Sequence, residues 1–313
     1  MDKPSTSGQT QRRNPGFLRM HTGTGPFRKG LISIKPRVLL LAALLCLSGC
    51  SQSRDPRTHE IAVIAREEGS GTRSAFASLT GMEVPGGDAT LETAEISNST
   101  AVVTLTVSGD PCAIGYVSLG ALSSRVKPLK VDGVPPTAEA LRSGRYGLYR
   151  PFSVCVRTER LTALETDFLG YLQSPQAREV LTAEGYIPPD SPSEDYAPED
   201  VHGTLRISGS TSVSAVMEVL VQQYRALHPD VTADLQQTGS GAGIAATLEG
   251  TCRIGMSSRA LTEAELSQGL TEIPIALDGI AVIVHPENPV EDVSLETLRN
   301  IFTGGYTRWS ELP

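Results

Sequence analysis

Residues 204–227 read TLRISGSTSVSAVMEVLVQQYRAL. The short apolar run at 205–207 is typical of a buried strand, and a polar turn rich in Gly, Ser and Thr follows it. Beyond the turn, apolar residues recur three and four positions apart, as they do along one face of an α-helix. They are Val213, Val216, Met217, Leu220, Val221, Tyr224 and Leu227. The segment therefore predicts a strand, a tight turn and an amphipathic helix, which together form a building unit of α/β folds.

The same layout occurs in two other places. Glu68-Gly69-Ser70-Gly71-Thr72 follows the apolar run 61–64, and Thr238-Gly239-Ser240-Gly241-Ala242-Gly243 precedes another helical pattern. The first turn of a helix has unpaired N–H groups and the positive end of the helix dipole, so it attracts anions, and glycine lets the backbone approach a ligand closely. One such turn alone is most simply an N-cap. Three of them, with Arg66 beside one as a charged fork, indicate a site for a tetrahedral oxyanion.

The rest of the chain continues the α/β pattern. Further strands are predicted at 113–117, 152–156 and 275–284, and helices are predicted within 162–184 and 295–302. Asp278-Gly279 interrupts the apolar segment 275–284, which is consistent with a bend or with a functional carboxylate. Residues 190–203, DSPSEDYAPEDVHG, are acidic and rich in Pro, as linkers are. A chain of this length after the leader can form two modest lobes or one large one.

The first 49 residues are predicted to be a signal peptide. Eight Lys or Arg precede the ten-residue apolar run Val38–Leu47, which is too short to span a bilayer, and Leu47-Ser48-Gly49-Cys50 follows. This ending resembles a bacterial lipobox, which implies lipidation of Cys50 and a tether over residues 50–59. The alternative is a plain signal peptide with a chance cysteine. We expect an extracytoplasmic protein, anchored on the outer face of the cytoplasmic membrane or in the periplasm.

Charge limits the class of partner. Eight of the 27 Lys and Arg and one of the 35 Asp and Glu lie before Cys50, so the remaining 19 and 34 leave the mature chain at about −15. Such an acidic chain is not expected to bind nucleic acid, whose phosphates are held by clustered basic residues. A small anion also has to be held by local donors, because the overall field repels it.

Enzyme and nucleotide motifs are missing from the sequence. It contains neither G-x-x-x-x-G-K-[ST], nor G-x-G-x-x-G, nor G-x-S-x-G, and none of the five histidines neighbours a candidate nucleophile. The three cysteines after Cys50 fit no zinc spacing and are expected to be small buried side chains. We therefore expect a binding protein that is not an enzyme and needs neither metal nor cofactor.

Taken together, ten stretches resemble the phosphate-specific substrate-binding proteins of ABC importers. They are ISGSTSV (207–213), TGSGAGI (238–244), IGMSSRAL (254–261), IALDGIAVIV (275–284), IFTGGYTRWSEL (301–312), REEGSGTRSAF (66–76), NSTAVV (98–103), AIGYVSLGAL (113–122), VDGVPPT (131–137) and RPF (150–152). The resemblance implies an α/β, two-lobed type II periplasmic-binding-protein fold, in which each lobe is a mixed sheet flanked by helices.

The order of these stretches differs from the order the resemblance implies. In that family the part ending in the Trp-containing motif precedes the part containing Arg-Glu-Glu-Gly-Ser-Gly-Thr, whereas this chain has the reverse. We interpret this as circular permutation, with 190–203 joining the usual ends. The alternative is two broken halves of a tandem protein. The predicted lobes are 60–118 with 285–313, which carries Arg66, and 119–189 with 204–284.

The resemblance also implies the ligand residues. Phosphate would be bound by Arg66, Ser70, Gly71 and Thr72 from one lobe and by Thr211, Ser212, Ser240, Gly241 and Ser258 from the other. Some members have Asp where this chain has Ser258, and that Asp accepts the proton of hydrogen phosphate. Another acceptor is then needed, and the candidates are Asp278 and Glu68. The departure weakens the expectation that sulfate is rejected.

The function implied is capture of inorganic phosphate and delivery to ABC permease subunits, by a monomer held to the membrane through Cys50. Two alternatives stay open at this point. One is a phosphate sensor or buffer lipoprotein with no permease partner, and the other is an enzyme acting on phosphoesters.

Overall fold

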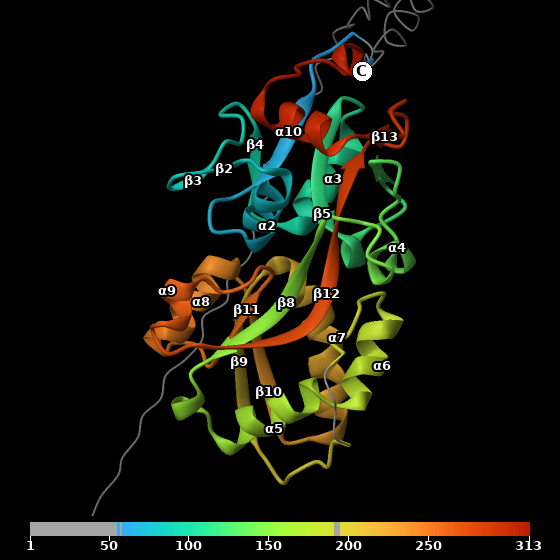
Figure 1. The fold of residues 1–313 in the computed structure, drawn as a ribbon. Coiled ribbons are helices and arrows are strands. Elements are labelled where there is room, and N and C mark those ends of the chain that lie inside the picture. The colour runs from blue at the N-terminus through green and yellow to red at the C-terminus, as the bar shows by residue number, and fades with distance from the viewer. Residues whose placement is uncertain (1–54, 57, 191–194) are drawn as a thin grey trace, which may run out of the picture. The chain divides into compact units, whose positions relative to one another are not determined.

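The computed structural model describes residues 55–56, 58–190 and 195–313 (Figure 1). The predicted signal peptide, the lipidation of Cys50 and the first part of the tether lie outside the described residues. Within these ranges, no helix combines the length and the apolar character that crossing a membrane requires. The described part of the chain has two main hydrophobic cores, and we call the half around each core a lobe.

The first lobe carries Arg66 at the end of its strand β1. Strand β1 pairs in parallel with β4 on one side and with β5 on the other. Its main elements are β1 (Ala62–Arg66), α2 (Gly71–Thr80), β4 (Glu95–Ser97), α3 (Thr100–Gly109), β5 (Ala113–Ser118) and α10 (Leu295–Thr303). The rings of Phe76 and Tyr116 stack in the core of this lobe and Phe302 packs against both at an angle, so α2, β5 and α10 meet there. This packing fixes α2 with its N-terminus just after Arg66.

The second lobe is built around four strands and the helices that pack on them. Strand β9 pairs in parallel with β10 and β11, and β11 pairs antiparallel with β8. The elements are β8 (Tyr149–Val156), α5 (Ala163–Leu172), α6 (Pro175–Ala183), β9 (Gly203–Gly209), α7 (Thr211–Leu227), β10 (Val231–Gln237), α8 (Ser240–Glu249), β11 (Ile254–Ser257) and α9 (Glu263–Leu266). Two of these strands lead directly into helices, β9 into α7 and β10 into α8.

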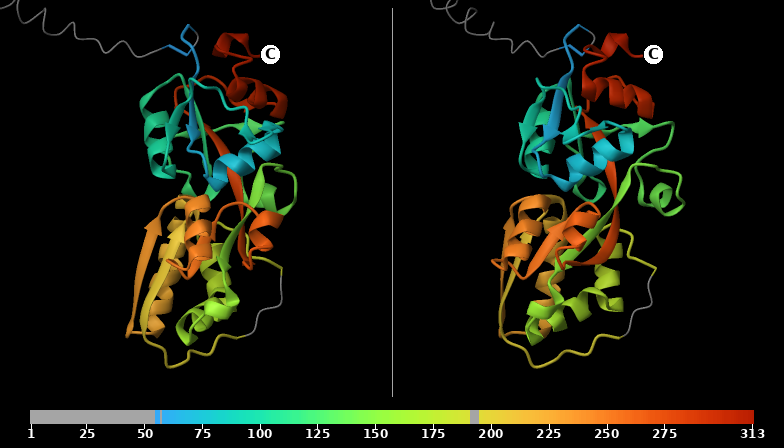
Figure 2. Two further views of the ribbon diagram at one scale, coloured as in Figure 1. Left: turned by 90° about the vertical axis from the view of Figure 1, so that its left-hand side faces the viewer. Right: turned by 60° about the vertical axis from the view of Figure 1, so that its left-hand side comes forward.

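Two long strands connect the lobes. Strand β12 (Thr271–Val284) pairs with β8 over residues 271–279 and with β5 over residues 280–284. Both views in Figure 2 show β8 (green) and β12 (red-orange) passing from one half to the other. Within the described residues, nine strands thus form one continuous mixed sheet. The shorter elements are β2 (Glu83–Val84), β3 (Gly87–Asp88), β6 (Lys127–Pro128), β7 (Lys130–Val131), α4 (Ala138–Arg142) and β13 (Asp292–Val293).

The packing places the lobe boundary elsewhere than the sequence suggested. Buried side chains between Leu129 and Leu148, together with Ile280, Val282 and Val284, belong to the core of the Arg66 lobe. The prediction had put residues 119–148 and 280–284 in the other lobe. The reason is that β12 does not end at the crossing but continues into the sheet of the Arg66 lobe, so the chain changes lobes at Asp278-Gly279. The interruption at Asp278-Gly279 marks this crossing.

The α/β alternation predicted from the sequence is confirmed, and each of the three Gly/Ser/Thr turns follows a strand and opens a helix. The apolar stripe on α7 is buried as expected except at its end, since Leu227 is 48% exposed. The helix ends at this residue, whereas Tyr224 in the same turn and the capping His228 are buried, so the exposure is confined to the last position of the stripe.

The described part of the acidic linker is attached to the second lobe. The hydroxyl of Tyr196 donates to Asp167 Oδ2 at 2.5 Å and lies 2.6 Å from His228 Nε2. The backbone N–H of Glu199 donates to Asp167 Oδ1 at 3.2 Å, and Val201 is buried in the lobe's core. Composition predicted a linker, whereas the structure shows a segment held in place by a buried carboxylate.

Replacing Tyr196 with Phe is expected to lower the free energy of unfolding by about 1–3 kcal/mol, because a hydrogen bond to a charged group is lost. Urea unfolding followed by circular dichroism measures this change, and phosphate affinity should stay the same. Tyr149→Phe is the matched control, since the Tyr149 side chain is 46% exposed. An unchanged unfolding midpoint for Tyr196→Phe would show that the linker is not held through this hydroxyl.

The two ends of the described chain lie side by side. The N–H of Ile61 donates to the carbonyl of Thr307 at 2.7 Å, and Glu60 forms an antiparallel bridge with Arg308. Adjacent ends are what a circular permutation requires. The permutation itself stays a prediction.

A cleft of hydroxyl groups around Arg66

Four helix N-termini, two from each lobe, meet where the lobes touch. Helices α2 and α3 belong to the Arg66 lobe, and α7 and α8 belong to the other. Serine side chains cap two of them. Ser70 Oγ accepts from the N–H of Arg73, and Ser210 Oγ accepts from the N–H groups of Ser212 and Val213. The convergence brings four positive dipole ends to one place, which favours a bound anion.

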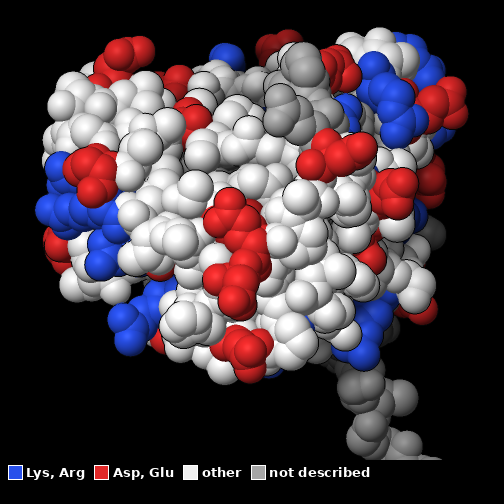
Figure 3. Space-filling model, turned by 90° about the horizontal axis from the view of Figure 1, so that it is seen from below, with Lys and Arg blue, Asp and Glu red and all other residues white. Residues whose placement is uncertain are grey.

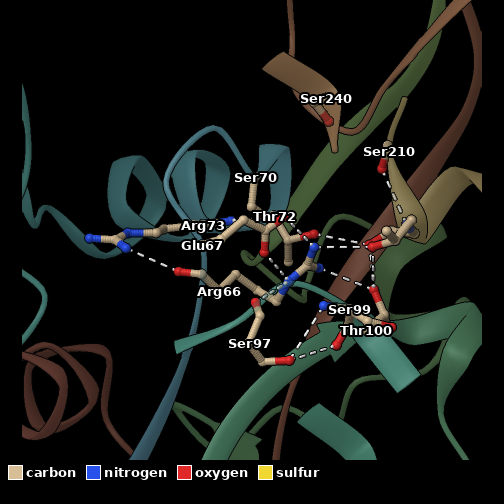
Figure 4. A network of polar contacts seen from close by, with 12 residues as sticks. Arg66, Glu67, Ser70, Thr72, Arg73, Ser97, Ser99, Thr100, Ser210 and Ser240 are labelled. Carbon is tan, nitrogen blue, oxygen red and sulfur yellow. Dashed lines mark hydrogen bonds and ion pairs between the residues drawn. The ribbon is translucent and has the colours of Figure 1, made fainter. Parts of the chain in front are cut away.

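Arg66 lies at the centre of this junction and is 2% exposed (Figure 4). Its Nε and Nη2 both donate to the carboxylate of Glu67 at 2.9 Å. On the other side, Nη1 donates to Thr100 Oγ1 at 3.1 Å and Nη2 donates to Thr211 Oγ1 at 3.0 Å. The guanidinium is therefore oriented by a carboxylate along one edge and directs its remaining donors at hydroxyl groups of both lobes.

Hydroxyl groups from the two lobes form a buried cluster next to the guanidinium. Thr72 Oγ1 lies 3.0 Å from Ser212 Oγ, and Thr100 Oγ1 lies 3.1 Å from Ser212 Oγ and 3.2 Å from Thr211 Oγ1. A hydroxyl can donate as well as accept, so each of these groups can turn its hydrogen toward an anion. Because every one of these contacts joins the two lobes, the cluster exists only when the lobes are together.

A second pair of serines lies on the other side of the α2 N-terminus. Ser240 Oγ lies 3.3 Å from Ser258 Oγ and accepts from the backbone N–H of Ser258 at 3.2 Å. Gly71 lies directly opposite, because a Cβ built on it would come within 2.5 Å of Ser240 Oγ and 2.6 Å of Ser258 Oγ. In addition, the N–H of Gly241 donates to the carbonyl of Gly69 across the lobes at 3.0 Å. Only a residue without a side chain allows this approach.

The predicted ligand residues are brought together around this junction. Arg66, Thr72, Thr211 and Ser212 form the central cluster, and Gly71 lies against Ser240 and Ser258. Two predicted donors have other partners, since Ser70 Oγ caps α2 and the N–H of Gly241 bonds Gly69. That these residues bind phosphate stays a prediction. The Arg66 lobe holds Arg66, Ser70, Gly71 and Thr72 of this set, and the other lobe holds Thr211, Ser212, Ser240, Gly241 and Ser258.

The two candidate proton acceptors lie in different surroundings. Asp278 is 1% exposed at the crossing between the lobes, where its carboxylate accepts from Ser118 and Arg150. Burial raises the pKa of Asp278, and the nearby Arg150 charge opposes that rise. Glu68 is exposed in the turn that precedes α2. Which of them accepts a proton from the ligand stays a prediction.

Thr100 is a residue of the cluster that the sequence prediction missed. It is the first residue of α3 and contacts Arg66, Thr211 and Ser212. A signal was present, because Ser97-Asn98-Ser99-Thr100 is a polar turn between a strand and a helix like the other three. It lacks glycine, and the glycines were what drew attention to the others.

The electrostatics of the junction are local. Burial raises the pKa of Tyr116 to about 12, so its hydroxyl stays protonated while it accepts from the backbone N–H of Arg66 at 3.2 Å.

On the face of the molecule shown in Figure 3, acidic side chains run across the middle of the surface and basic ones gather toward its edges. The net charge of the chain therefore does not attract an anion, and the donors of the junction have to hold it.

Fold and site together describe a two-lobed protein whose lobes meet at a buried, hydroxyl-rich site around an arginine. Residues 51–176 and 195–313 match the PBP superfamily domain. The chain is 40% identical over 272 residues to the phosphate-binding protein PstS 2 of Streptococcus agalactiae serotype V, covering 85% of this chain and 92% of that protein. It is 41% identical to PstS 2 of Streptococcus pneumoniae serotype 4, with the same coverage.

A solved structure gives the same result. The crystal structure of a phosphate ABC transporter phosphate-binding protein from S. pneumoniae TIGR4 is 41% identical and matches with a TM-score of 0.66, covering 81% of this chain and all of that one. The chain belongs to the PBP superfamily and, within it, to the family of PstS phosphate-binding proteins. This membership confirms the expected two-lobed α/β fold and the expectation of a binding protein rather than an enzyme. Because the match to the streptococcal PstS 2 proteins covers 85% of this chain, any permuted order of the chain would also be the order in those relatives.

Proposed function

We propose that this protein captures inorganic phosphate between its two lobes and delivers it to an ABC importer. The observation that carries the proposal is the buried cluster in which Arg66 meets hydroxyl groups from both lobes. The cluster offers neutral donors on several sides and one permanent positive charge, which suits a tetrahedral oxyanion. The names of the streptococcal relatives, phosphate-binding proteins of phosphate ABC transporters, agree with this ligand.

The number of donors is sufficient for tight binding. Hydrogen bonds to a charged group contribute about 1.5–3 kcal/mol each. Micromolar affinity corresponds to about −8 kcal/mol, so several such bonds reach it after the costs of association are subtracted. The contacts that join the lobes explain how capture is completed, because closure places donors on both sides of the ligand.

The location proposed is the outer face of the cell membrane, with the protein held through lipidated Cys50 as a monomer. The support comes from the basic leader, its apolar run and the lipobox-like ending, and from the family match, which begins at residue 51. A protein tethered there would release phosphate directly beside the permease subunits of its importer.

Uptake of radiolabelled phosphate tests the complete proposal. Cells lacking the gene should take up phosphate more slowly at micromolar concentrations, and the intact gene should restore the rate. A Cys50→Ser variant should restore it less well, because the protein is then released from the membrane. Equal uptake with and without the gene, in cells with no second phosphate-binding protein, would contradict delivery to an importer.

Ser258→Asp tests the selectivity of the proposed site. A carboxylate at this buried position repels sulfate, which has no proton to share, but accepts the proton of hydrogen phosphate. We expect sulfate affinity to fall at least about tenfold more than phosphate affinity, since an unpaired like-charge contact costs more than 1 kcal/mol. Competition titrations with the two anions measure this ratio. An equal change in both affinities would show that position 258 does not face the ligand.

A further inference from the structure

Two buried guanidiniums near the cleft are held in the same way. Arg66 uses Nε and Nη2 for the carboxylate of Glu67. Arg150, on β8, uses Nε and Nη2 for Asp278 Oδ2, at 3.3 and 3.1 Å. In both cases one edge of the fork is occupied by a carboxylate and Nη1 is left for another partner. Arg66 Nη1 has Thr100, whereas Arg150 Nη1 is buried and has no hydrogen-bond partner among the described residues.

Arg150 lies where the two lobes are connected. It faces Asp278 across the pairing of β8 with β12, and Asp278 accepts from Ser118 at the end of β5 at 2.8 Å. Both side chains of the ion pair are 1% exposed. The pair thus links the three strands that meet at the crossing, and any change in the angle between the lobes acts on it. A buried N–H without a partner is costly, so this donor favours a state in which it gains one.

Arg150 also lies close to the anion-binding helix α2. With Ser74, Ala75 and Ser78 of α2, it lines a groove of about 490 Å³ between the lobes. These α2 residues follow Gly71, which lies opposite Ser240 and Ser258 with no room for a Cβ between them. Burial lowers the pKa of Arg150, Asp278 opposes that effect, and the positive charge of Arg66 lowers it further. The two cations therefore repel each other, and an anion bound beside Arg66 would offset this repulsion.

We propose that Arg150 is a second cationic residue of the anion site, held at the lobe crossing by Asp278, and that its free Nη1 gains a partner when the anion binds. The inference rests on the proposed function, because it concerns the same site and the same anion. This role explains why the buried partner of Asp278 is a guanidinium, although an ammonium or a neutral side chain at position 150 would leave fewer N–H donors without a partner. The second positive charge would also favour doubly charged anions, since position 258 has a serine rather than a carboxylate that would repel them.

Isothermal titration of inorganic phosphate into three variants tests this role. In Arg150→Met with Asp278→Asn the buried pair is removed as a unit, so no charge is left unpaired. We expect this double variant to bind phosphate about 10- to 100-fold more weakly than the wild type, which is the effect of one charge-assisted contact. Arg150→Lys keeps the charge but not the fork, and should lie between the two. Arg259→Met is the matched control, because Arg259 lines the same groove but both of its Nη atoms donate to the carboxylate of Glu265.

The melting temperature without ligand separates a structural role from an effect on the anion. If Arg150 has a structural role alone, phosphate affinity should fall only in variants whose melting temperature falls. Our inference predicts that phosphate binding is weak even in a variant with the melting temperature of the wild type. Wild-type affinity in the double variant would overturn the inference. If the double variant does not unfold cooperatively, Arg150→Lys decides, and affinity equal to the wild type would overturn it. Absence of binding by the wild type would instead remove the proposed function.

Discussion

Replacing Arg66 with Ala is expected to weaken phosphate binding by about 100- to 10,000-fold, because two charge-assisted hydrogen bonds at about 1.5–3 kcal/mol each are lost. The guanidinium brings a permanent charge into direct contact with the hydroxyl cluster, through Thr100 and Thr211. Isothermal titration measures the affinity. Lysine at this position should recover only part of it, since an ammonium cannot present two parallel donors.

The control for this variant is Arg145→Ala. Arg145 has the same charge, but its side chain is 59% exposed. If long-range attraction brought the anion to the protein, both variants would weaken binding to a similar extent. We expect Arg145→Ala to bind like the wild type, because exposed charges are screened by salt. A loss in Arg66→Ala no larger than that in the control would contradict the central position given to Arg66.

Replacing Gly71 with Ala is expected to weaken phosphate binding by about 10- to 100-fold through crowding alone. The added Cβ would lie 2.5 Å from Ser240 Oγ, 2.6 Å from Ser258 Oγ and 3.1 Å from Ser240 Cβ. Those serines belong to the opposite lobe, so the methyl group holds the lobes apart. Small-angle scattering with saturating phosphate should then show a less compact protein than the wild type.

Gly170→Ala is the matched control for crowding. Gly170 lies within α5, and nothing lies within 4 Å of a Cβ built on it. This substitution should raise the free energy of unfolding by about 0.5–1 kcal/mol, because alanine favours a helix more than glycine does, and should leave affinity unchanged. Normal affinity in Gly71→Ala would mean that the lobes do not close at this contact.

The local parts of the site could be predicted from the sequence because their signals are local. A strand, a Gly/Ser/Thr turn and an apolar stripe occupy consecutive residues, so the turns at 68–72, 208–212 and 238–243 could be assigned to helix N-termini without knowing the fold. Arg66 could be singled out because it immediately precedes such a turn. The resemblance then supplied the pairing of turns between lobes, which no single stretch contains.

The remaining parts depend on contacts between distant residues. Thr100 belongs to the site because α3 begins opposite Thr211, 111 positions away in the sequence. The attachment of Tyr196 needs Asp167 and His228 to be close to it, and the boundary at Asp278-Gly279 needs β12 to pair with two different strands. Apart from its place in the RPF stretch (150–152), Arg150 gave no local signal, since its partner lies on another strand. Composition and periodicity do not encode such pairings.

Isothermal titration of phosphate into the mature protein, with Cys50 replaced by Ser and bound anion removed, tests the central claim most directly. Running wild type and Arg66→Ala side by side isolates the cleft. The account predicts binding of one phosphate per chain at micromolar affinity or tighter for the wild type, and a loss of at least about 100-fold for the variant. Wild-type protein that unfolds cooperatively yet binds no phosphate, or a variant that binds equally well, would contradict it.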